Sequence, residues 1–312
     1  MDDLRAYQQM PKKLIYTFYH VPLNEVKTIL RFGFLNFFLM KEGKKLMKKH
    51  VHKLSFSQAQ PNLDIHFLTG KNFLYQSLFC IYSLEKHTNL SFKIHLYDDG
   101  SFDSDTIKQI KSLVPNAYIH TKEEINERIS KYLPNELFPY LNYKRKVYPH
   151  IKKLTDIHCG SSGWKLVLDS DMLFTSRPNE ILDWLENPDR PIYMVDSTYS
   201  YGFPKEAMEN LCKETIPDLL NVGVIGLNSS NINWEKLEEW SKALESKFGS
   251  TYYLEQGLTA MLVGNARSTV LNKKQYVVYP KDLGQNNTKL LHFVDLSKAL
   301  YFRKSWRKLL EL

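Results

Sequence analysis

The sequence predicts an α/β fold, with a mainly parallel sheet flanked by helices and a helical extension at residues 1–60. From residue 63 onward, strand-like runs alternate with segments of helical periodicity, which is typical of a parallel sheet covered by helices. The aliphatic run 166–168 leads directly into carboxylates, as expected of a buried strand that ends at a binding site. The first 60 residues show a helical character and no strand pattern.

Strands are expected where short apolar runs are bounded by turn residues. They are residues 63–69, 92–97, 117–120, 164–168, 191–195 and 219–227. The second run ends in a turn signal at 98–100. The last run contains Gly223 and Gly226, which allow another part of the chain to approach the backbone closely.

Helices are expected where apolar residues recur with a helical period. In the segment 72–85, leucine and isoleucine recur at positions 74, 78, 81 and 84. The expected helices are residues 72–85, 106–114, most of 122–158, 233–248, 252–263 and a basic amphipathic helix at 297–310.

The composition is that of a globular protein. The chain has 312 residues, 43% of them hydrophobic and 24% charged, enough for one large core or one core with an added subdomain. Cys80, Cys159 and Cys212 show no metal-ligand spacing, which argues against a disulfide framework or a zinc site and fits a reducing cytosol. No apolar run reaches the ~20 residues of a membrane span, and the polar start predicts no signal peptide. We therefore expect a cytoplasmic protein.

Missing motifs weigh against several enzyme classes. The sequence has neither the G-x-G-x-x-G of dinucleotide-binding folds nor the G-x-x-x-x-G-K-[ST] of P-loop NTPases. It also lacks the G-x-S-x-G of serine hydrolases. The net charge of +8 and pI of about 9.1 permit anionic partners, which include nucleotide-linked substrates, anionic lipid and nucleic acid.

The strongest functional signal is Asp169-Ser170-Asp171, which directly follows the expected strand 164–168. Two carboxylates at this spacing can bind one hard divalent cation, which is usually shared with phosphate oxygens of a substrate. An ordinary strand-end turn is the alternative. The same tripeptide at 103–105 precedes a helical segment, where carboxylates satisfy free N–H groups and the helix dipole. For that copy we expect a structural role.

A basic segment lies near the start of the chain. Residues 41–53 hold six lysines and one glutamate, and they follow a run rich in phenylalanine and leucine at 32–40. A helix of this mixed character can lie on an anionic membrane surface. Alternatively, the helix packs on the α/β domain and exposes its lysines to water.

Several short segments together suggest a family. They are the strand 64–68 with Thr69-Gly70-Lys71-Asn72-Phe73, Asp169-Ser170-Asp171, Leu220-Asn221-Val222-Gly223-Val224, Glu255-Gln256-Gly257 and His292-Phe293. Their order resembles the family 8 glycosyltransferases, retaining enzymes with the nucleotide-diphospho-sugar transferase fold of two abutting Rossmann-like halves. The resemblance covers about residues 63–306. It implies an N-terminal extension at 1–60 and a catalytic domain at 61–312.

The resemblance implies a nucleotide site after the first strand. Leu68, Gly70, Asn72 and Phe73 match the positions that hold the uracil and ribose, and Phe73 can stack on the base. The family usually has an aspartate where Gly70 stands. A nucleotide-sugar donor, in particular a UDP-hexose, is therefore the expected substrate.

The resemblance also implies a manganese or magnesium ion that bridges the donor diphosphate. Asp169, Asp171 and His292 match its ligands, and Ser170 lies between the two carboxylates. His292 taken alone would be an ordinary core or surface histidine.

A lysine and an arginine of the family lie near the donor diphosphate. Lys298 has the spacing of that lysine, and Lys304 is the alternative, although Lys304 can also belong to a solvated helix face. The arginine position falls at about His150 or Lys152.

Near the sugar, the resemblance implies Asn221 and Gln256, while Asp196 and Glu255 are the nearest carboxylates. Amides are poor bases, and an inverting transferase needs a base to deprotonate the acceptor. The lack of an obvious base therefore favours retention. Alternatively, Asn221 satisfies backbone groups at a strand end, and Gln256 faces solvent on its helix.

Taken together, the sequence predicts a metal-dependent retaining glycosyltransferase that moves a hexose from a nucleotide-sugar to a glycan or glycolipid acceptor at the inner membrane face. No nucleic-acid partner is expected. A phosphohydrolase with Asp169 as nucleophile is one alternative, but Met172-Leu173 replaces the Gly-Thr or Gly-Val that this class has after the pair. A non-catalytic binding protein with the same fold is the other alternative.

Overall fold

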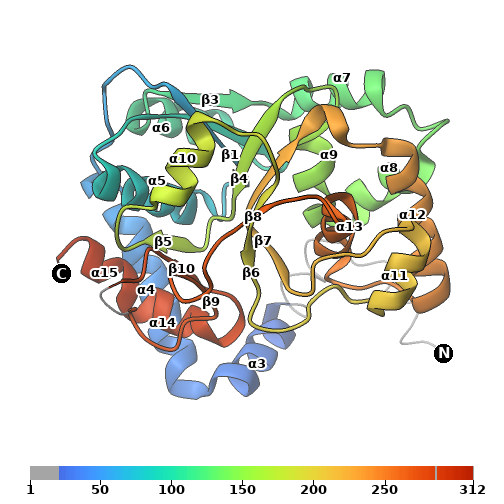
Figure 1. Ribbon diagram of the computed structural model, residues 1–312. Coiled ribbons are helices and arrows are strands. Elements are labelled where there is room, and N and C mark those ends of the chain that lie inside the picture. Colours follow the sequence, from blue (N-terminus) through green and yellow to red (C-terminus); the bar gives the residue numbers. More distant parts are fainter. Residues whose placement is uncertain (1–20, 285–286, 312) are drawn as a thin grey trace, which may run out of the picture.

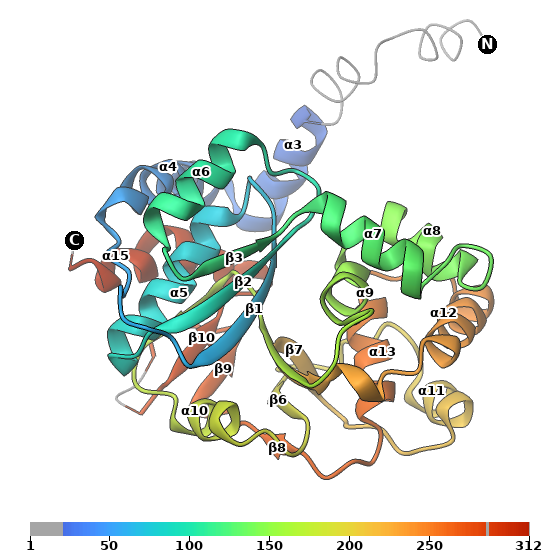
Figure 2. The ribbon, with the colours of Figure 1, turned by 90° about the horizontal axis from the view of Figure 1, so that it is seen from above.

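The computed structural model of the protein describes residues 21–284 and 287–311. A central sheet of seven strands carries helices on both faces (Figures 1 and 2). This is the α/β architecture that the sequence predicts. Residues 1–20 of the predicted N-terminal extension lie outside the described residues.

The strands of the central sheet are β1 (Leu63–Thr69), β2 (Phe92–Asp98), β3 (Ala117–His120), β4 (Trp164–Leu168), β6 (Ile192–Val195), β7 (Leu220–Asn228) and β8 (Thr269–Val270). Their order is β3-β2-β1-β4-β7-β6-β8. Strand β7 is antiparallel to both neighbours, and the other pairs are parallel. The sheet is therefore mainly parallel, and each predicted strand is present, whereas β8 was not predicted.

The helices on one side of the sheet are α5 (Leu74–Thr88), α6 (Ser104–Leu113) and α10 (Asn179–Glu186) (Figure 2). The helices on the other side are α7 (Lys122–Tyr132), α8 (Pro139–Val147), α9 (Lys152–His158), α11 (Lys205–Cys212), α12 (Trp234–Phe248) and α13 (Leu254–Val263). Each face has its own cluster of buried apolar side chains. The predicted helices are present within a few residues, while α10 and α11 were not predicted. Asp103 caps α6 by accepting a hydrogen bond from the Thr106 N–H at 2.9 Å, which confirms the structural role expected of the copy at 103–105.

A second sheet of three short strands lies beside the first. It consists of β5 (Met172–Phe174), β10 (Leu290–His292) and β9 (Tyr276–Val278), in that order. Strand β10 is antiparallel to β5, with His292 opposite Met172, and parallel to β9. The sequence did not predict these strands, because three-residue strands carry too little periodicity.

The two ends of the described chain pack together. The N-terminal part forms α3 (Val21–Phe32), α4 (Phe34–Lys49) and η2 (His50–Lys53). Helix α4 buries Met40, Gly43 and Met47 against a C-terminal helical run (Figure 1). A side-chain Cβ at Gly43 would lie 1.9 Å from the Phe302 carbonyl oxygen, so only glycine allows this approach.

The C-terminal run comprises η5 (Asp295–Ser297), α14 (Lys298–Leu300), the π-helical turn η6 (Tyr301–Ser305) and α15 (Trp306–Leu309). The sequence predicted one regular helix at 297–310, but the structure has this π-helical interruption, whose residues Tyr301, Phe302 and Ser305 are buried. Within the described ranges, no helix combines the length and apolar character that crossing a bilayer requires.

The contacts of α4 agree with the predicted packing of this segment on the α/β domain. Met40 and Met47 belong to the same apolar cluster as strand β1 and helix α5, while lysines 41, 44, 45, 48 and 49 are exposed. The division into an extension and a catalytic domain at residue 60 stays a prediction, and so does the membrane contact of the lysine face.

Buried and half-buried histidines lie on the face of β1, β2 and β3 that α7 covers. The rings of His66 and His95 stack with centroids 4.5 Å apart, and His120 stacks on Tyr97 at 3.9 Å. Burial lowers the pKa of His120 to about 3, and the positive charges of His95 and Arg128 add to the shift. The fold therefore holds this histidine in its neutral form.

We expect the free energy of unfolding to fall as the pH drops from about 6.5 toward 3. In the unfolded chain a histidine takes up a proton near its ordinary pKa of 6.5, whereas folded His120 stays neutral down to about pH 3, so protons favour the unfolded chain in this window. Urea titrations at stepwise lower pH measure the slope. A His120→Asn variant should show a shallower slope, and the exposed control His52→Gln the parental one. Identical slopes in the three proteins would contradict the prediction.

Candidate functional site

Two carboxylates and one imidazole meet where β4 ends. Asp169 and Asp171 lie between β4 and β5, and His292 ends β10. His292 Nε2 lies 3.6 Å from Asp169 Oδ2 and 3.3 Å from Asp171 Oδ1. One potential ligand atom from each of the three residues lies within 4.8 Å of the others, so the three side chains can hold one ion. The β5–β10 pairing brings His292 to the aspartates, and Phe293 N–H donates to the Asp171 carbonyl oxygen at 2.9 Å.

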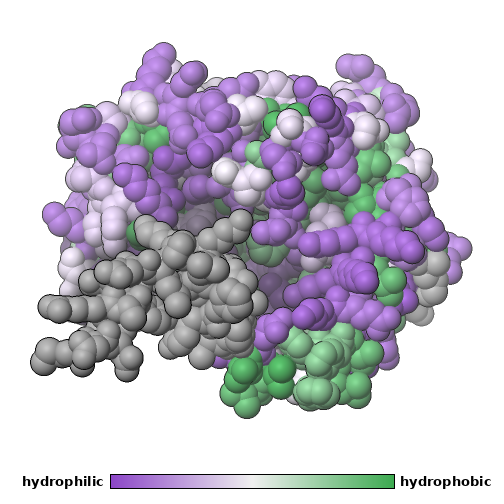
Figure 3. Space-filling model, turned by 180° about the vertical axis from the view of Figure 1, so that it is seen from behind, coloured by the Kyte–Doolittle hydropathy of each residue, from purple (hydrophilic) through white to green (hydrophobic). Residues whose placement is uncertain are grey.

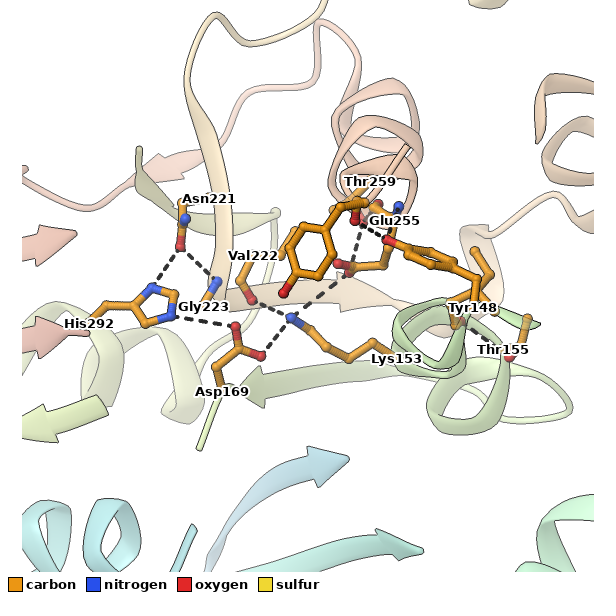
Figure 4. A network of polar contacts seen from close by, with 12 residues as sticks. Tyr148, Lys153, Thr155, Asp169, Asn221, Val222, Gly223, Glu255, Thr259 and His292 are labelled. Carbon is orange, nitrogen blue, oxygen red and sulfur yellow. Dashed lines mark hydrogen bonds and ion pairs between the residues drawn. The ribbon is translucent and has the colours of Figure 1, made fainter. Parts of the chain in front are cut away.

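The hydrogen bonds of Asn221 determine which nitrogen of His292 carries the proton. Asn221 Oδ1 accepts from the Gly223 N–H at 2.9 Å and also lies 3.1 Å from His292 Nδ1, which must then be the donor (Figure 4). His292 Nε2 is therefore the nitrogen that can ligate an ion held by the two carboxylates. This is the tautomer that a metal ligand needs, fixed by a second hydrogen bond. Two carboxylates with one imidazole can together hold a divalent metal ion.

Gly223 is necessary for this geometry. A Cβ on Gly223 would lie 2.4 Å from His292 Nδ1 and 2.9 Å from Asn221 Oδ1. Any side chain at this position would push the imidazole away from the aspartates. Gly223 lies in the middle of β7, and its carbonyl oxygen accepts from the Asp169 N–H at 2.9 Å, so the same residue also positions the acidic pair.

Each carboxylate has its own lysine. Lys153 is a buried residue of α9. Its Nζ donates to Asp169 Oδ1 at 2.8 Å and to the Val222 carbonyl oxygen at 2.9 Å (Figure 4). Lys298 Nζ lies 3.1 Å from Asp171 Oδ2. Burial alone would raise the pKa of Asp171, but the Lys298 ammonium beside it holds that pKa well below its usual range. The Asp171 carboxylate is therefore ionised and ready for a cation.

Glu255 lies behind Lys153, at the start of α13. Its Oε1 is 4.0 Å from Lys153 Nζ, and its backbone N–H donates to the Tyr148 hydroxyl at 3.3 Å (Figure 4). Burial raises the pKa of Glu255 to about 7, an effect that Lys153 partly offsets. Around neutral pH this carboxyl group consequently exists in both protonation states.

A chain of buried amides extends from the imidazole. Asp196 Oδ2 accepts from Asn221 Nδ2 at 3.0 Å and from Gln256 Nε2 at 2.9 Å. Asp196 Oδ1 accepts from the Ser197 N–H at 2.7 Å. The Ser197 hydroxyl also donates to Asp196 Oδ1, at 3.4 Å. The structure thus brings Asn221, Gln256 and Asp196 together, and it engages the Asp196 carboxylate in four hydrogen bonds.

The expected nucleotide residues lie at the end of β1. Leu68 is half-buried in the strand, and the side chains of Asn72 and Phe73 are exposed beyond it. A Cβ on Gly70 would lie 2.1 Å from Asp99 Oδ2, so the Asp99 carboxylate occupies the space of a side chain at position 70. Asp99 follows the neighbouring strand β2, so nothing in the local sequence around Gly70 pointed to it.

Some predicted residues lie elsewhere. Lys304 lines a separate pocket with Tyr279, whereas Lys298 is at the acidic pair. Lys152 Nζ donates to the Asp99 carbonyl oxygen at 2.7 Å and does not reach the carboxylates, where Lys153 lies instead. No sequence signal distinguishes these two adjacent lysines, because only the packing of α9 decides which of them faces the sheet.

A Gly223→Ala substitution should weaken manganese binding by about 10- to 100-fold, the usual effect of disturbing a group that orients a metal ligand. The reason is that the added methyl group displaces the His292 ring. Titration of the protein with manganese, followed by electron paramagnetic resonance, measures the change. Circular dichroism checks that the fold is retained. A folded variant with parental affinity would show that His292 is not a ligand.

Comparison with known proteins supports the fold. The sequence matches no protein-family model and no curated protein sequence. The structure resembles the bifunctional glycosyltransferase WbbM in its apo form, with a TM-score of 0.53 and 13% identity over 81% of this chain and 51% of that chain. It also resembles the galactosyltransferase LgtC in complex with donor and acceptor sugar analogues, with a TM-score of 0.52 and 15% identity over 79% of this chain and 96% of that chain. The chain thus matches about half the length of WbbM and nearly all of LgtC. It has the fold of the GT-A glycosyltransferases, as the sequence predicted.

Proposed function

We propose that the protein is a metal-dependent retaining glycosyltransferase that moves a hexose from a UDP-sugar to a glycan or glycolipid acceptor. The observation that carries this proposal is the cluster of Asp169, Asp171 and His292, with one lysine on each carboxylate, in a fold shared with glycosyltransferases. Asp169, Asp171 and His292 would hold a manganese or magnesium ion, which would supply positive charge for the diphosphate that leaves the sugar.

The lysines support a diphosphate at this site. Lys298 and Lys153 approach the acidic pair from two elements, α14 and α9. Cationic groups fixed in place before the reaction stabilise the charge that develops on a leaving phosphate. Lys298 is our choice for the diphosphate contact, since Lys304 lines a separate pocket.

Asp99 and Phe73 support a uracil base. The N3–H of uracil is a hydrogen-bond donor, and the Asp99 carboxylate beside Gly70 is an acceptor at the end of β1. The Phe73 ring is 54% exposed and available for stacking. Cytosine has no hydrogen on N3, so a carboxylate here favours UDP over CDP. The base would thus lie at the end of β1, with Asn72 and Leu68 beside it.

The amide network supports retention. Asp196 accepts hydrogen bonds from both Asn221 and Gln256, so it has little capacity left to act as a base. We infer that a phosphate oxygen of the leaving diphosphate takes the acceptor proton. The bond from the anomeric carbon to phosphate breaks, the bond to the acceptor oxygen forms on the same side, and Gln256 acts on the charge at the anomeric carbon.

The experiment that tests the proposal is a donor screen with the full chain. Hydrolysis of UDP-, GDP- and CMP-sugars is measured with manganese present, and UDP-hexoses should be cleaved fastest. Asp171→Asn should lower this rate by about 100-fold or more, because it removes a charged metal ligand. The matched control is Asp103→Asn, the first aspartate of the helix-capping Asp-Ser-Asp, which should keep the parental rate. Equal rates in the two variants would contradict the metal assignment.

The stereochemistry gives a second test. An α-linked donor should yield an α-linked product, which proton NMR of the first-formed glycoside identifies. Gln256→Ala should lower turnover by about 100-fold with a smaller effect on donor affinity, because the amide acts on the transition state. A β-anomeric coupling in the product would exclude retention. Parental turnover in Gln256→Ala would remove this residue from the site.

A further inference from the structure

An apolar surface lies where α3 meets α4. Five large side chains are exposed there: Val26 (53%), Leu30 (80%), Phe34 (68%), Leu35 (69%) and Phe38 (48%). Positions 26, 30, 34 and 38 recur at every fourth residue, and the rings of Phe34 and Phe38 are in contact. Figure 3 shows an apolar patch at the lower edge of the molecule, below a hydrophilic surface. Single exposed apolar residues are common, but a contiguous group marks an interaction surface. We name these five residues the apolar corner.

Basic residues accompany the apolar corner. Residues 25–53 contain eight lysines and arginines and two glutamates. Glu25 pairs with Lys41 at 3.0 Å, and Arg31 pairs with Asp295 at 2.5 Å. Lys45 and Lys49 lie on the exposed face of α4. Lys44 and Lys48 lie at the edge of that face, over the rings of Phe302 and Tyr75. Apolar side chains next to excess positive charge match the headgroup region of an anionic bilayer.

A basic pocket lies next to this corner. It is a cavity of about 350 Å³ between the end of β9 and the C-terminal helical run. Three of its described lining residues are cations, Lys281, Arg303 and Lys304, and none is a carboxylate. Apolar groups of Leu296 and Leu300 complete its wall. Such a pocket suits a phosphate group that carries an apolar chain.

Polar contacts join α3 and α4, which carry the corner, to the pocket. Arg303 Nη1 donates to Asn36 Oδ1 at 2.5 Å, and Asn36 Nδ2 donates to the Phe32 carbonyl oxygen at 2.9 Å. The pair of Arg31 with Asp295 connects α3 to η5, next to the pocket wall. The pocket and the helices of the corner are therefore in direct contact.

We propose that the apolar corner and the basic pocket together bind an anionic glycerophospholipid bilayer. The corner enters the boundary between headgroups and acyl chains, and the pocket holds the phosphate of one lipid headgroup. Charge complementarity argues for this occupant, because three cations meet in one cavity. The proposal adds a membrane surface to the proposed function, but binding to that surface does not depend on glycosyl transfer.

Docking in this way would bring the candidate site close to the bilayer. Lys298, which contacts Asp171, lies in the same short helix as the pocket residues Ala299 and Leu300. An acceptor embedded in the membrane could then reach the donor without leaving the lipid. This favours a lipid-linked acceptor over a free sugar.

Vesicle flotation with the full chain tests the proposal. The vesicles contain phosphatidylcholine, with or without phosphatidylglycerol. The double variant Lys281→Gln/Lys304→Gln should lower the affinity for phosphatidylglycerol vesicles by about 25-fold, because each lysine charge near an anionic surface contributes about fivefold to the affinity. Phe34→Ser/Leu35→Ser should lower it at least as strongly through lost apolar burial. The matched controls are Lys242→Gln/Lys247→Gln on α12 and Leu137→Ser before α8, which replace exposed residues of the same kinds.

Specific outcomes would overturn the proposal. The pocket is refuted if its double variant binds like the α12 control, and the corner is refuted if its double variant binds like Leu137→Ser. If the parental protein binds inorganic phosphate in calorimetry but the pocket double variant keeps full vesicle binding, the pocket binds a free anion and not a lipid headgroup. If the parental protein is a dimer that does not bind vesicles, and Phe34→Ser/Leu35→Ser dissociates this dimer, the corner is a contact between two copies of the chain. None of these measurements needs a sugar donor, so they remain informative even if the proposed transfer reaction is absent.

Discussion

The candidate site depends on the pairing of two three-residue strands, β5 and β10. The register of this pair places His292 opposite Met172, next to Asp171, although the two residues lie far apart in the sequence. Without it, the Asp-Ser-Asp segment would be an acidic turn at the end of β4. The pairing also explains why β7 carries a glycine at 223, because the imidazole that β10 delivers needs the space of a Cβ. One short ladder of hydrogen bonds thus assembles groups from β4, β7 and β10.

The charges of the site are nearly balanced without any ligand. Asp169 and Asp171 are matched by Lys153 and Lys298, and Glu255 adds a group that titrates near neutral pH. A divalent cation alone would add two positive charges to this partly buried cluster, so we expect it to bind more weakly than a cation paired with an anion. A cation that arrives with a diphosphate restores the balance. Under the proposed function, this charge balance would couple the binding of the metal to the binding of the donor.

The sequence predicted what depends on local pattern and missed what depends on packing. The buried strand before Asp169, the alternation of strands and helices, and the different roles of the two Asp-Ser-Asp copies follow from neighbours along the chain. The resemblance to a family then pointed to His292 and Lys298. Lys153 was missed in favour of Lys152, since helix orientation is decided by tertiary contacts. Asp99 was missed because it fills the space at Gly70 from the segment after another strand. The π-helical turn at Tyr301–Ser305 interrupts a segment whose periodicity indicated a regular helix.

The contact between α4 and the C-terminal helical run has a consequence for biosynthesis. Gly43 packs against the backbone of Phe302. The segment that contains Phe302 is synthesised after all strands of the central sheet, so α4 cannot complete this contact until that segment has left the ribosome. Until then Met40 and Met47 remain exposed on the nascent chain, a period in which chaperones or a nearby membrane can bind them. Lys298 lies in the same late segment, close to α4. The last steps of folding therefore complete both the support of the N-terminal helix and the cationic side of the candidate site, and a chain that stops before this segment lacks both.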